Sequence, residues 1–391
     1  MSESLSLNIT GRRPTWAEID LNALAGNFQI IKNHVGAAVE VMAVVKANAY
    51  GHGAVACSQK LEAEGADWFG VALPEEGIEL RNAGITKPIL CLAGFWEGQA
   101  EACLQHKLVP AVSRMDNIAA LDAAALDRGE VADVHVKLDT GMGRLGVRFD
   151  EVNDFADALG RFRNIRVDGL MTHFAAADEP TCGALTNDQV TRFDTAVAVF
   201  REKGFRPSYR HLSNSAGVFA QPAASGKLGG ETGGNMVRPG GVLYGLWRDI
   251  LDPEHRDQPF QPVMSLHSRI TLLKWVPAGE TVGYGCTFEA SRKTLVATIP
   301  VGYDDGYRRA LSNRGHAIIR GASATVIGRI SMDLTLVDVT NVLNVQVDDE
   351  VVLLGHSGGH AITAEELGKI AGTLSYEITC GIGSRVPRLN R

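Results

Sequence analysis

Lys46 is the first residue along the chain whose type and position suggest chemistry. It follows the continuous apolar run Val41–Val45 in "VMAVVKANAYGHG", and Tyr50 comes four residues later, before a glycine-rich loop. Five consecutive apolar residues are typical of a strand that is covered on both faces. An amine beside apolar neighbours has its charged form disfavoured, so it can act as a nucleophile and a base. The alternative is a strand-end lysine that extends its ammonium group into solvent.

Polar residues at the ends of other predicted strands could share a site with Lys46. In a barrel of parallel strands these ends meet at one edge, where barrel enzymes carry their active sites. The loops after the last two strands commonly bind phosphate in this architecture, through hydroxyls and through glycine amides that come close to an anion. The residues at these strand ends are Lys46, Tyr50, Lys137, Asp139, Arg144, His173, His211, Asn214, Ser215, Arg238, Gly240 and Gly241.

A lysine, a phosphate cradle and a histidine that can stack on a ring are what pyridoxal phosphate requires. The predicted strand ends supply all three, so pyridoxal phosphate is one cofactor that the spacing favours. Structural roles stay open for single residues. His173 alone can be a hydrogen-bonded barrel histidine, and Arg238 alone can be an ion-pair partner.

The elements that must position these residues alternate between strands and helices up to residue 247. Helical segments such as "PEEGIELRNAG" begin with a proline and acids and end with a glycine. Eight strands with intervening helices predict an α/β fold, a (β/α)8 TIM-type barrel, and no GxGxxG follows the first strand as a dinucleotide-binding fold would require. The predicted strands are 41–47, 68–73, 88–94, 108–113, 132–139, 166–174, 210–215 and 237–245.

The composition changes after the predicted barrel. Residues 1–247 are therefore predicted as the barrel domain, the polar, proline-containing stretch 248–262 as a linker, and 263–391 as a C-terminal, mainly antiparallel β domain. The N-terminal segment "PTWAEIDLNALAGNFQIIKNHV" is expected to add a strand and a helix that return to or flank the second domain. Thr363 and Glu366 have the spacing of a capping box at the start of a helix.

The whole-chain composition excludes several classes of protein. The 391 residues carry a net charge of -7 without a basic run, which argues against nucleic-acid binding. Neither a secretory signal nor a membrane-spanning stretch is recognisable, so a cytoplasmic location is expected. The cysteines are scattered without a CxxC pair, so neither a metal site nor a disulfide framework is expected: Cys57, Cys91, Cys103, Cys182, Cys286 and Cys380.

A set of motifs, taken together, resembles the alanine racemases, which are fold-type III pyridoxal-phosphate enzymes. The resemblance extends in order from residue 43 to 388 and implies a barrel, a C-terminal β domain and a head-to-tail homodimer with shared active sites. The motifs are "AVVKANAYGHG", "KLDTGMGRLG", "THFAAAD", "LSNSAG", "NMVRPGGVLYGL", "VGYGCTF", "IPVGYDDGY", "GRISMD" and "SRVPR".

The resemblance implies a two-base racemisation of alanine. Lys46 corresponds to the lysine that holds the cofactor covalently and acts on one face of the substrate carbon. Tyr284 corresponds to the opposing base, contributed by the partner subunit. Arg144 is similar to the arginine that binds the substrate carboxylate and stabilises the tyrosine anion. Met332 and Tyr303 correspond to residues on the substrate side and at the entrance of the site.

The same resemblance implies where the phosphate of the cofactor is held. Tyr50 and Ser215 correspond to phosphate ligands, with Asn214 adjacent to them. Gly240 and Gly241 correspond to residues that contribute backbone amides.

Further residues are implied around the ring of the cofactor. His173 corresponds to a ring contact, and Arg238 to the residue that faces the pyridine nitrogen, with His211 behind it. Because arginine does not readily give up its proton, the ring nitrogen would stay unprotonated, which disfavours transamination. Lys137 corresponds to a lysine that is often carbamylated in the family and that orients Arg144.

One position departs from the family pattern. The segment "GIGSRVPR" has Ser384 where familiar members carry a tyrosine that touches the phosphate and narrows the entrance. A broader small amino-acid racemase, acting on alanine and serine, is therefore an alternative, and racemisation of serine is expected. A non-catalytic pyridoxal-phosphate carrier is a second alternative, and a fold-type III decarboxylase would leave Tyr284 and Arg144 without a purpose. The product would be D-alanine for peptidoglycan precursors, or D-alanine would be interconverted for catabolism.

Overall fold

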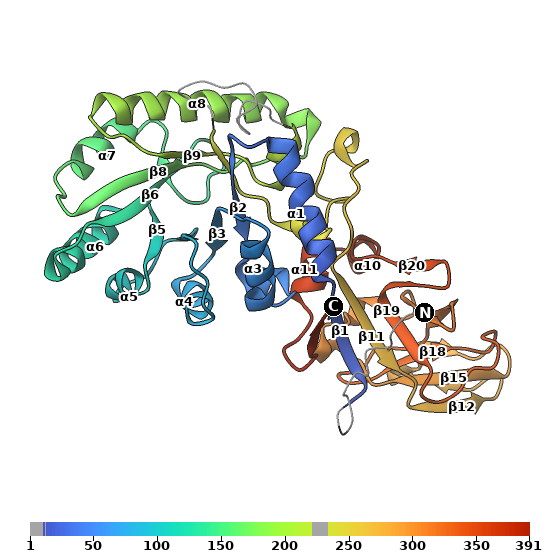
Figure 1. Cartoon of the computed structure of the whole chain (residues 1–391). Coiled ribbons are helices and arrows are strands. Elements are labelled where there is room, and N and C mark those ends of the chain that lie inside the picture. The colour runs from blue at the N-terminus through green and yellow to red at the C-terminus, as the bar shows by residue number, and fades with distance from the viewer. Residues whose placement is uncertain (1–10, 12, 221–233) are drawn as a thin grey trace. The chain divides into compact units, whose positions relative to one another are not determined.

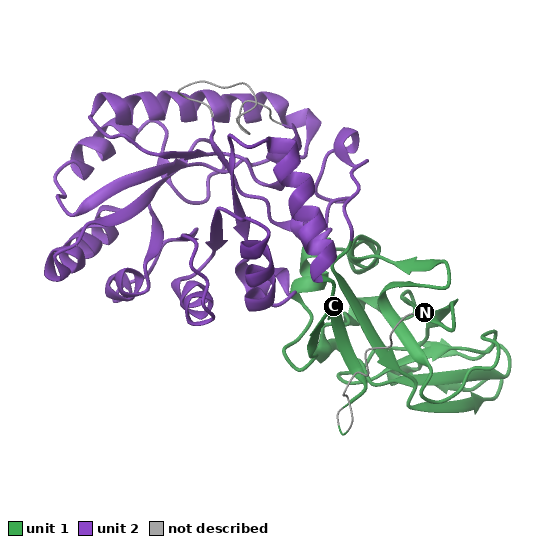
Figure 2. Cartoon of the chain, viewed as in Figure 1, with its two compact units in different colours: residues 1–20, 262–391 green, residues 21–261 purple. Residues whose placement is uncertain are grey.

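The chain divides into two compact units in the computed structural model, which describes residues 11, 13–220 and 234–391. Unit 1 consists of Met1–Asp20 and Pro262–Arg391, and unit 2 of Leu21–Gln261 (Figure 2). Residues 248–261, predicted as most of a linker, belong to unit 2 because apolar side chains such as Leu251 and Phe260 are buried there.

Unit 2 is a nearly closed barrel of parallel strands, which confirms the predicted fold class. The strands pair in the order β10-β2-β3-β4-β5-β6-β8-β9. Between the two end strands, the amide of Asn235 donates to the carbonyl of Arg210 at 2.9 Å. The barrel strands are β2 (Glu40–Val44), β3 (Trp68–Val71), β4 (Ile89–Cys91), β5 (Leu108–Val112), β6 (Ala132–Asp139), β8 (Ile165–Met171), β9 (Tyr209–His211) and β10 (Met236–Val237), with β7 (Val147–Arg148) beside β6.

Helices follow the barrel strands, and Figure 1 shows α3 to α8 outside the ring of strands. Among the helices that the structure describes, none has the length and apolar character needed to cross a membrane. The helices of unit 2 are α1 (Leu21–Val35), α2 (Lys46–Tyr50), α3 (Ala54–Ala63), α4 (Pro74–Asn82), α5 (Ala100–Gln105), α6 (Met115–Arg128), α7 (Val152–Leu159), α8 (Gly183–Glu202) and α9 (Ser215–Ala220), with 3-10 turns η1 (Pro180–Cys182), η2 (Gly241–Tyr244) and η3 (Pro253–His255).

Most of the predicted strands end earlier in the structure than the apolar pattern suggests, and two of them show why. The strand predicted at 237–245 is limited to β10, because the chain turns into η2 at Gly241. The strand predicted at 41–47 ends at Val44, and α2 follows. Each residue of Ala47–Tyr50 has φ of 53–54°, so this turn is left-handed. Non-glycine residues in that conformation cost roughly 1–2 kcal/mol each.

Tertiary contacts hold the left-handed turn in place. The Ala47 amide donates to Oε1 of Glu76 at 2.7 Å, and the Ala54 amide donates to Oδ1 of Asn48 at 2.8 Å. The Gly51 amide donates to the Ala47 carbonyl at 3.0 Å. Strained backbone persists only where its surroundings determine it, and it is concentrated at functional sites.

Unit 1 is built on a mainly antiparallel sheet in the order β12-β15-β18-β17-β16-β19-β11-β1-β21. The N-terminal strand β1 pairs with β11 and β21, so the start of the chain belongs to unit 1. The Thr363 hydroxyl accepts from the Glu366 amide at the start of α10, the predicted helix cap. The strands are β1 (Thr15–Ile19), β11 (Met264–Arg269), β12 (Leu272–Val276), β13 (Thr281–Val282), β14 (Phe288–Glu289), β15 (Thr294–Ile299), β16 (His316–Ile319), β17 (Ala322–Val326), β18 (Thr335–Asp338), β19 (Glu350–Ser357), β20 (His360–Ile362) and β21 (Arg388–Asn390). The helices and 3-10 turns are η4 (Tyr284–Cys286), η5 (Tyr303–Asp305), η6 (Arg309–Leu311), α10 (Ala364–Ala371) and α11 (Ser375–Cys380).

The left-handed turn predicts opposite effects for one substitution at two exposed alanines. Ala47→Gly should stabilise the protein by about 0.5–1 kcal/mol, because glycine adopts a positive φ freely. Ala120→Gly, at an exposed position of the right-handed helix α6, should destabilise it by about 1 kcal/mol. Guanidinium unfolding of both variants measures the difference. Equal losses of stability would contradict strain in the turn.

Candidate active site

Tyr50, Ser215 and Gly240 lie together at the mouth of the barrel. The Gly240 amide donates to Oγ of Ser215 at 2.9 Å, and a Cβ placed on Gly240 would lie 2.3 Å from the Tyr50 hydroxyl. Any larger residue at 240 would therefore displace Tyr50. Asn214 Oδ1 accepts from the Gly217 amide at 2.9 Å and caps α9, and Gly241 begins η2. Two hydroxyls and two chain turns thus converge where an anion could bind.

Arg238 is a buried cation that is surrounded by neutral acceptors. Its Nη2 donates to the carbonyls of Thr172 at 2.7 Å and Leu212 at 3.1 Å, and it lies 3.2 Å from His173 Nδ1. Its Nη1 donates to His211 Nδ1 at 3.0 Å. Burial lowers the pKa of Arg238 to about 9. Burial, followed by the charge of Arg238, lowers the pKa of both histidines well below the ordinary value, so both rings are neutral.

Lys137 lies in the same charged environment. Burial lowers its pKa well below the ordinary value, and the charges of Arg238, Arg144 and Lys46 lower it further, against the opposing effect of Asp139. The neutral form of its amine, which is the nucleophilic one, is therefore favoured. These interactions bring the lysine and arginine residues predicted for the barrel site into one group.

Asp139, at the end of β6, shapes the loop that carries Arg144. Its Oδ1 accepts from the amides of Gly141 and Gly143, both at 3.0 Å. A Cβ on Gly146, whose φ is 127°, would lie 2.5 Å from the Asp139 amide nitrogen, so only glycine fits there. The glycines of "GMGRLG" therefore fold the loop tightly against β6 and leave Arg144 exposed.

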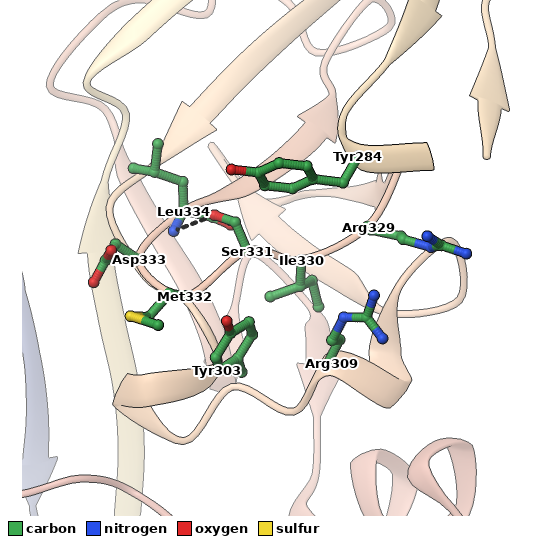
Figure 3. A pocket seen from close by; sticks show the side chains of 9 residues that line it. All are labelled: Tyr284, Tyr303, Arg309, Arg329, Ile330, Ser331, Met332, Asp333 and Leu334. Atoms are coloured by element: carbon green, nitrogen blue, oxygen red, sulfur yellow. Dashed lines mark hydrogen bonds between the residues drawn. The ribbon is translucent and has the colours of Figure 1, made fainter. Parts of the chain in front are cut away.

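The residues predicted from the C-terminal part of the chain meet in unit 1. Tyr284, Tyr303 and Met332 line one pocket of about 440 Å³, shown in Figure 3. The side chains of Arg309 and Arg329 also border it, and the sequence interpretation did not single out either residue. Arg329 lies in the quoted motif "GRISMD", which is the signal that could have identified it.

Tyr284 stands on a turn that glycines make possible. Gly283 and Gly285 flank it with φ of 77° and 72°. A Cβ on Gly285 would lie 2.5 Å from Nη1 of Arg329, so the guanidinium packs directly against this turn. The Tyr284 side chain is 72% exposed, which leaves its phenol accessible to a partner or ligand.

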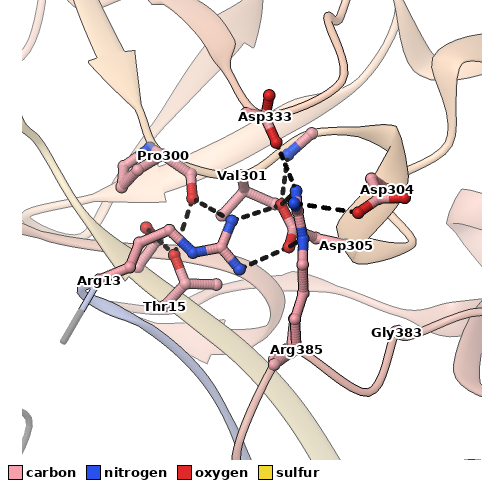
Figure 4. A network of polar contacts seen from close by, with 12 residues as sticks. Arg13, Thr15, Pro300, Val301, Asp304, Asp305, Asp333, Gly383 and Arg385 are labelled. Carbon is pink, nitrogen blue, oxygen red and sulfur yellow. Dashed lines mark hydrogen bonds and ion pairs between the residues drawn. The ribbon is translucent and has the colours of Figure 1, made fainter.

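A buried carboxylate, Asp305, fixes the wall of this pocket (Figure 4). Arg13 donates to both Asp305 oxygens, at 2.8 and 2.5 Å, and Nε of Arg385 donates to Oδ1 at 2.7 Å. Arg385 also donates to Asp333 of the pocket at 2.7 Å, and Asp305 shares its turn with Tyr303. Burial alone would raise the pKa of Asp305, but the hydrogen bonds from both arginines outweigh it and hold the pKa below its ordinary value.

Comparisons of sequence identify relatives that match both units. A family model described as alanine racemase, N-terminal domain, matches residues 19–247, and one described as alanine racemase, C-terminal domain, matches residues 263–390. The alanine racemase of Citrifermentans bemidjiense is 44% identical over 379 residues, which are 95% of this chain and 97% of that protein. That of Symbiobacterium thermophilum is 43% identical over 389 residues, 98% of each chain.

Solved structures of alanine racemases are similar to this chain over nearly its whole length. The alanine racemase from a D-cycloserine-producing Streptomyces lavendulae has a TM-score of 0.86 and 35% identity, over 97% of both chains. The alanine racemase from Bartonella henselae with covalently bound pyridoxal phosphate has a TM-score of 0.84 and 28% identity, over 97% of this chain and 99% of that one.

Asp305 offers a test of what holds the pocket wall. Asp305→Asn leaves two arginines without their buried counter-charge, so stability at pH 7 should fall by about 3–5 kcal/mol. Because the folded-state pKa is depressed, the contribution is complete above about pH 4 and is lost as the pH falls further, so the difference should narrow in acid. Urea unfolding between pH 3 and 7 measures this change.

The neighbouring Asp304 is the matched control. Its side chain is 53% exposed and pairs with Arg385 alone among the ion pairs found in the described residues. Asp304→Asn should therefore cost less than about 1 kcal/mol. Similar losses in the two variants would contradict a special role for the buried carboxylate.

Proposed function

Because the chain belongs to the alanine racemase family, we propose that it interconverts L-alanine and D-alanine by moving a proton at the alpha carbon of the substrate. Such an amino-acid isomerase needs one base for each face of that carbon. The observation that carries the proposal is the presence of two suitable groups, Lys46 among the cations of unit 2 and Tyr284 on the pocket of unit 1.

Pyridoxal phosphate is the cofactor that we propose for unit 2. The close contact of Gly240 with Tyr50, and the Ser215 hydroxyl beside them, fit the phosphate, which Gly241 and Asn214 would border. Lys46 would hold the aldehyde carbon, and His173 and Arg238 would contact the ring. When bound, pyridoxal phosphate withdraws electrons from the alpha carbon of the substrate and makes its proton acidic.

The remaining residues bind the substrate and orient the bases. The guanidinium of Arg144 would bind the planar carboxylate with two hydrogen bonds. A phenol is a weak base at neutral pH, so Tyr284 needs a cation that stabilises its anion, and Arg144 meets that need. Met332 and Tyr303 would border the substrate from the side of the pocket.

Lys137 would supply a negative charge that orients Arg144. We propose that its neutral amine adds carbon dioxide and loses a proton, which gives a carbamate anion. The low pKa of Lys137 supports this reaction, because only an unprotonated amine adds carbon dioxide.

A head-to-tail homodimer would bring the barrel residues of unit 2 in one copy together with the pocket residues of unit 1 in the other. Tyr284, Met332, Leu334 and Tyr303 expose between 41% and 72% of their surface around the pocket, a concentration of exposed apolar side chains that is typical of an interface. In this arrangement the pocket of one copy completes the barrel site of the other. We place this enzyme in the cytoplasm.

Proton exchange in heavy water tests the two-base assignment. The enzyme should introduce deuterium at the alpha carbon of alanine as optical rotation decays. Lys46→Ala should abolish both, together with the yellow absorbance of bound cofactor. Tyr284→Phe should slow racemisation by about 10²–10⁴-fold while one enantiomer still exchanges its proton without inversion. Proton NMR and polarimetry measure the two rates.

Tyr307→Phe is the control, because Tyr307 is buried elsewhere in unit 1 and should leave both rates unchanged. Equal exchange of both enantiomers by Tyr284→Phe would refute the assignment.

The same assay with L-serine tests the broader specificity expected from Ser384, which is exposed directly before Arg385. Exchange at background level would limit the enzyme to alanine.

Mixed dimers test the shared site. Lys46→Ala and Tyr284→Phe are each expected to be nearly inactive, yet their heterodimer would contain one intact Lys46–Tyr284 site. Random co-assembly should restore about a quarter of wild-type activity, since half of the dimers are mixed and each has one of two sites intact. Lys46→Ala with Arg144→Ala, both in unit 2, should restore none. Heterodimers without activity in the first mixture would refute sharing.

A further inference from the structure

A chain of three buried side chains leads from Arg238 into the interior of the barrel. Nη1 of Arg238 lies 3.0 Å from His211 Nδ1, and His211 Nε2 lies 2.8 Å from His135 Nδ1. Arg238 is 3% exposed, and both histidines are fully buried. The chain therefore connects the mouth of the barrel to the layer of side chains beneath it.

The direction of the hydrogen bonds in this chain follows from Arg238. A guanidinium can only donate, so in this structure His211 Nδ1 presents its lone pair to Arg238. The proton of the neutral His211 ring is then on Nε2, which donates to His135 Nδ1. Burial, followed by the charge of Arg238, lowers the pKa of His135 to about 3, so this ring is neutral as well. Its own proton is on Nε2, which has no hydrogen-bond acceptor among the described residues.

The packing around His135 holds its ring in one orientation. A Cβ placed on Gly169, its neighbour on β8, would lie 2.6 Å from three atoms of the ring. On the other sides, the rings of Trp68 and Tyr209 lie 5.2 and 5.7 Å away. Both belong to an otherwise apolar interior layer, in which Met42 is also buried. A neutral polar ring in such a layer requires a reason beyond filling space.

We infer that His135 is a positioning residue that acts through His211 on Arg238. By accepting from His211 Nε2, it keeps the Nδ1 lone pair of His211 directed at Arg238, and thereby holds the guanidinium in its place. Gly169 takes part by leaving the space that the ring of His135 occupies. The catalytic part of this inference rests on the proposed function, in which Arg238 faces the cofactor ring; the tautomer part does not.

Two substitutions of His135 separate its acceptor from its volume. His135→Asn can retain an acceptor oxygen near the position of Nδ1, whereas His135→Leu removes it at similar size. In the holoenzyme labelled with 15N-histidine, His211 of the wild type and of the Asn variant should show a proton on Nε2 alone. The Leu variant should show a mixture of tautomers. The resonances that disappear from the spectrum of His211→Asn are assigned to His211.

The kinetic constants should rank the variants in the same order, with His135→Asn close to the wild type and His135→Leu impaired. For His135→Leu, kcat for alanine should fall about 3- to 10-fold, the size of one hydrogen bond between neutral groups, with KM within about twofold. Pyruvate formed by side transamination should rise relative to racemisation. His135→Asn should recover most of kcat. Met42→Leu, in the same interior layer, is the control and should leave the NMR spectrum and kcat unchanged.

Gly169→Ala provides a second route if His135→Leu does not fold. It keeps the imidazole but pushes the ring from its place, so it should produce the same mixture of His211 tautomers. An unchanged tautomer in both variants would overturn the positioning role. A changed tautomer with wild-type kcat and no added pyruvate would overturn its connection to catalysis and the assignment of Arg238.

Discussion

The burial of positive charge is the constraint on which the site in unit 2 depends. Arg238 is almost fully buried, and the charges of Arg238, Arg144 and Lys46 all lower the pKa of Lys137. Positive charges that lie near one another repel, and the folded chain accepts this cost. A bound anion would relieve this repulsion, so the same residues suit an anionic ligand such as the phosphate of the proposed cofactor or the carboxylate of the proposed substrate. The barrel makes the arrangement possible because its strand ends converge.

The barrel could be predicted because it depends on local patterns, and the same patterns led to the barrel residues that we propose for the site. Apolar runs identify strands, and polar residues at their ends identify the edge of the site. The same patterns failed where tertiary contacts decide the backbone. The run after Val45 looks like a continuing strand, but Ala47–Tyr50 is left-handed, held in part by the bond from Ala47 to Glu76. The apolar residues of 237–245 were predicted as a strand, but most of them form the buried turn η2, and an apolar pattern alone does not distinguish the two.

The domain boundaries show a second limit of sequence reasoning. The polar stretch at 248–262 has the composition of a linker, yet Leu251 and Phe260 anchor most of it to unit 2. The strand β1 pairs with residues 264–269 and 388–390, which are distant in the sequence, and no local pattern reports such pairing. Arg309 was not identified from the sequence, because no local pattern distinguishes an arginine beside a pocket from any other surface arginine.

The neutral acceptors around Arg238 explain how a buried arginine keeps its positive charge available to a ligand. A carboxylate partner would cancel its charge and turn it into a structural ion pair. The lone pairs of two imidazoles and two backbone carbonyls accept from its two terminal nitrogens without cancelling the charge. The pKa of about 9 still lies above neutrality, so the guanidinium stays protonated at pH 7 and its charge acts on whatever binds beside it. Neutral histidines are thus the residues that can hold this cation in place and leave its field intact.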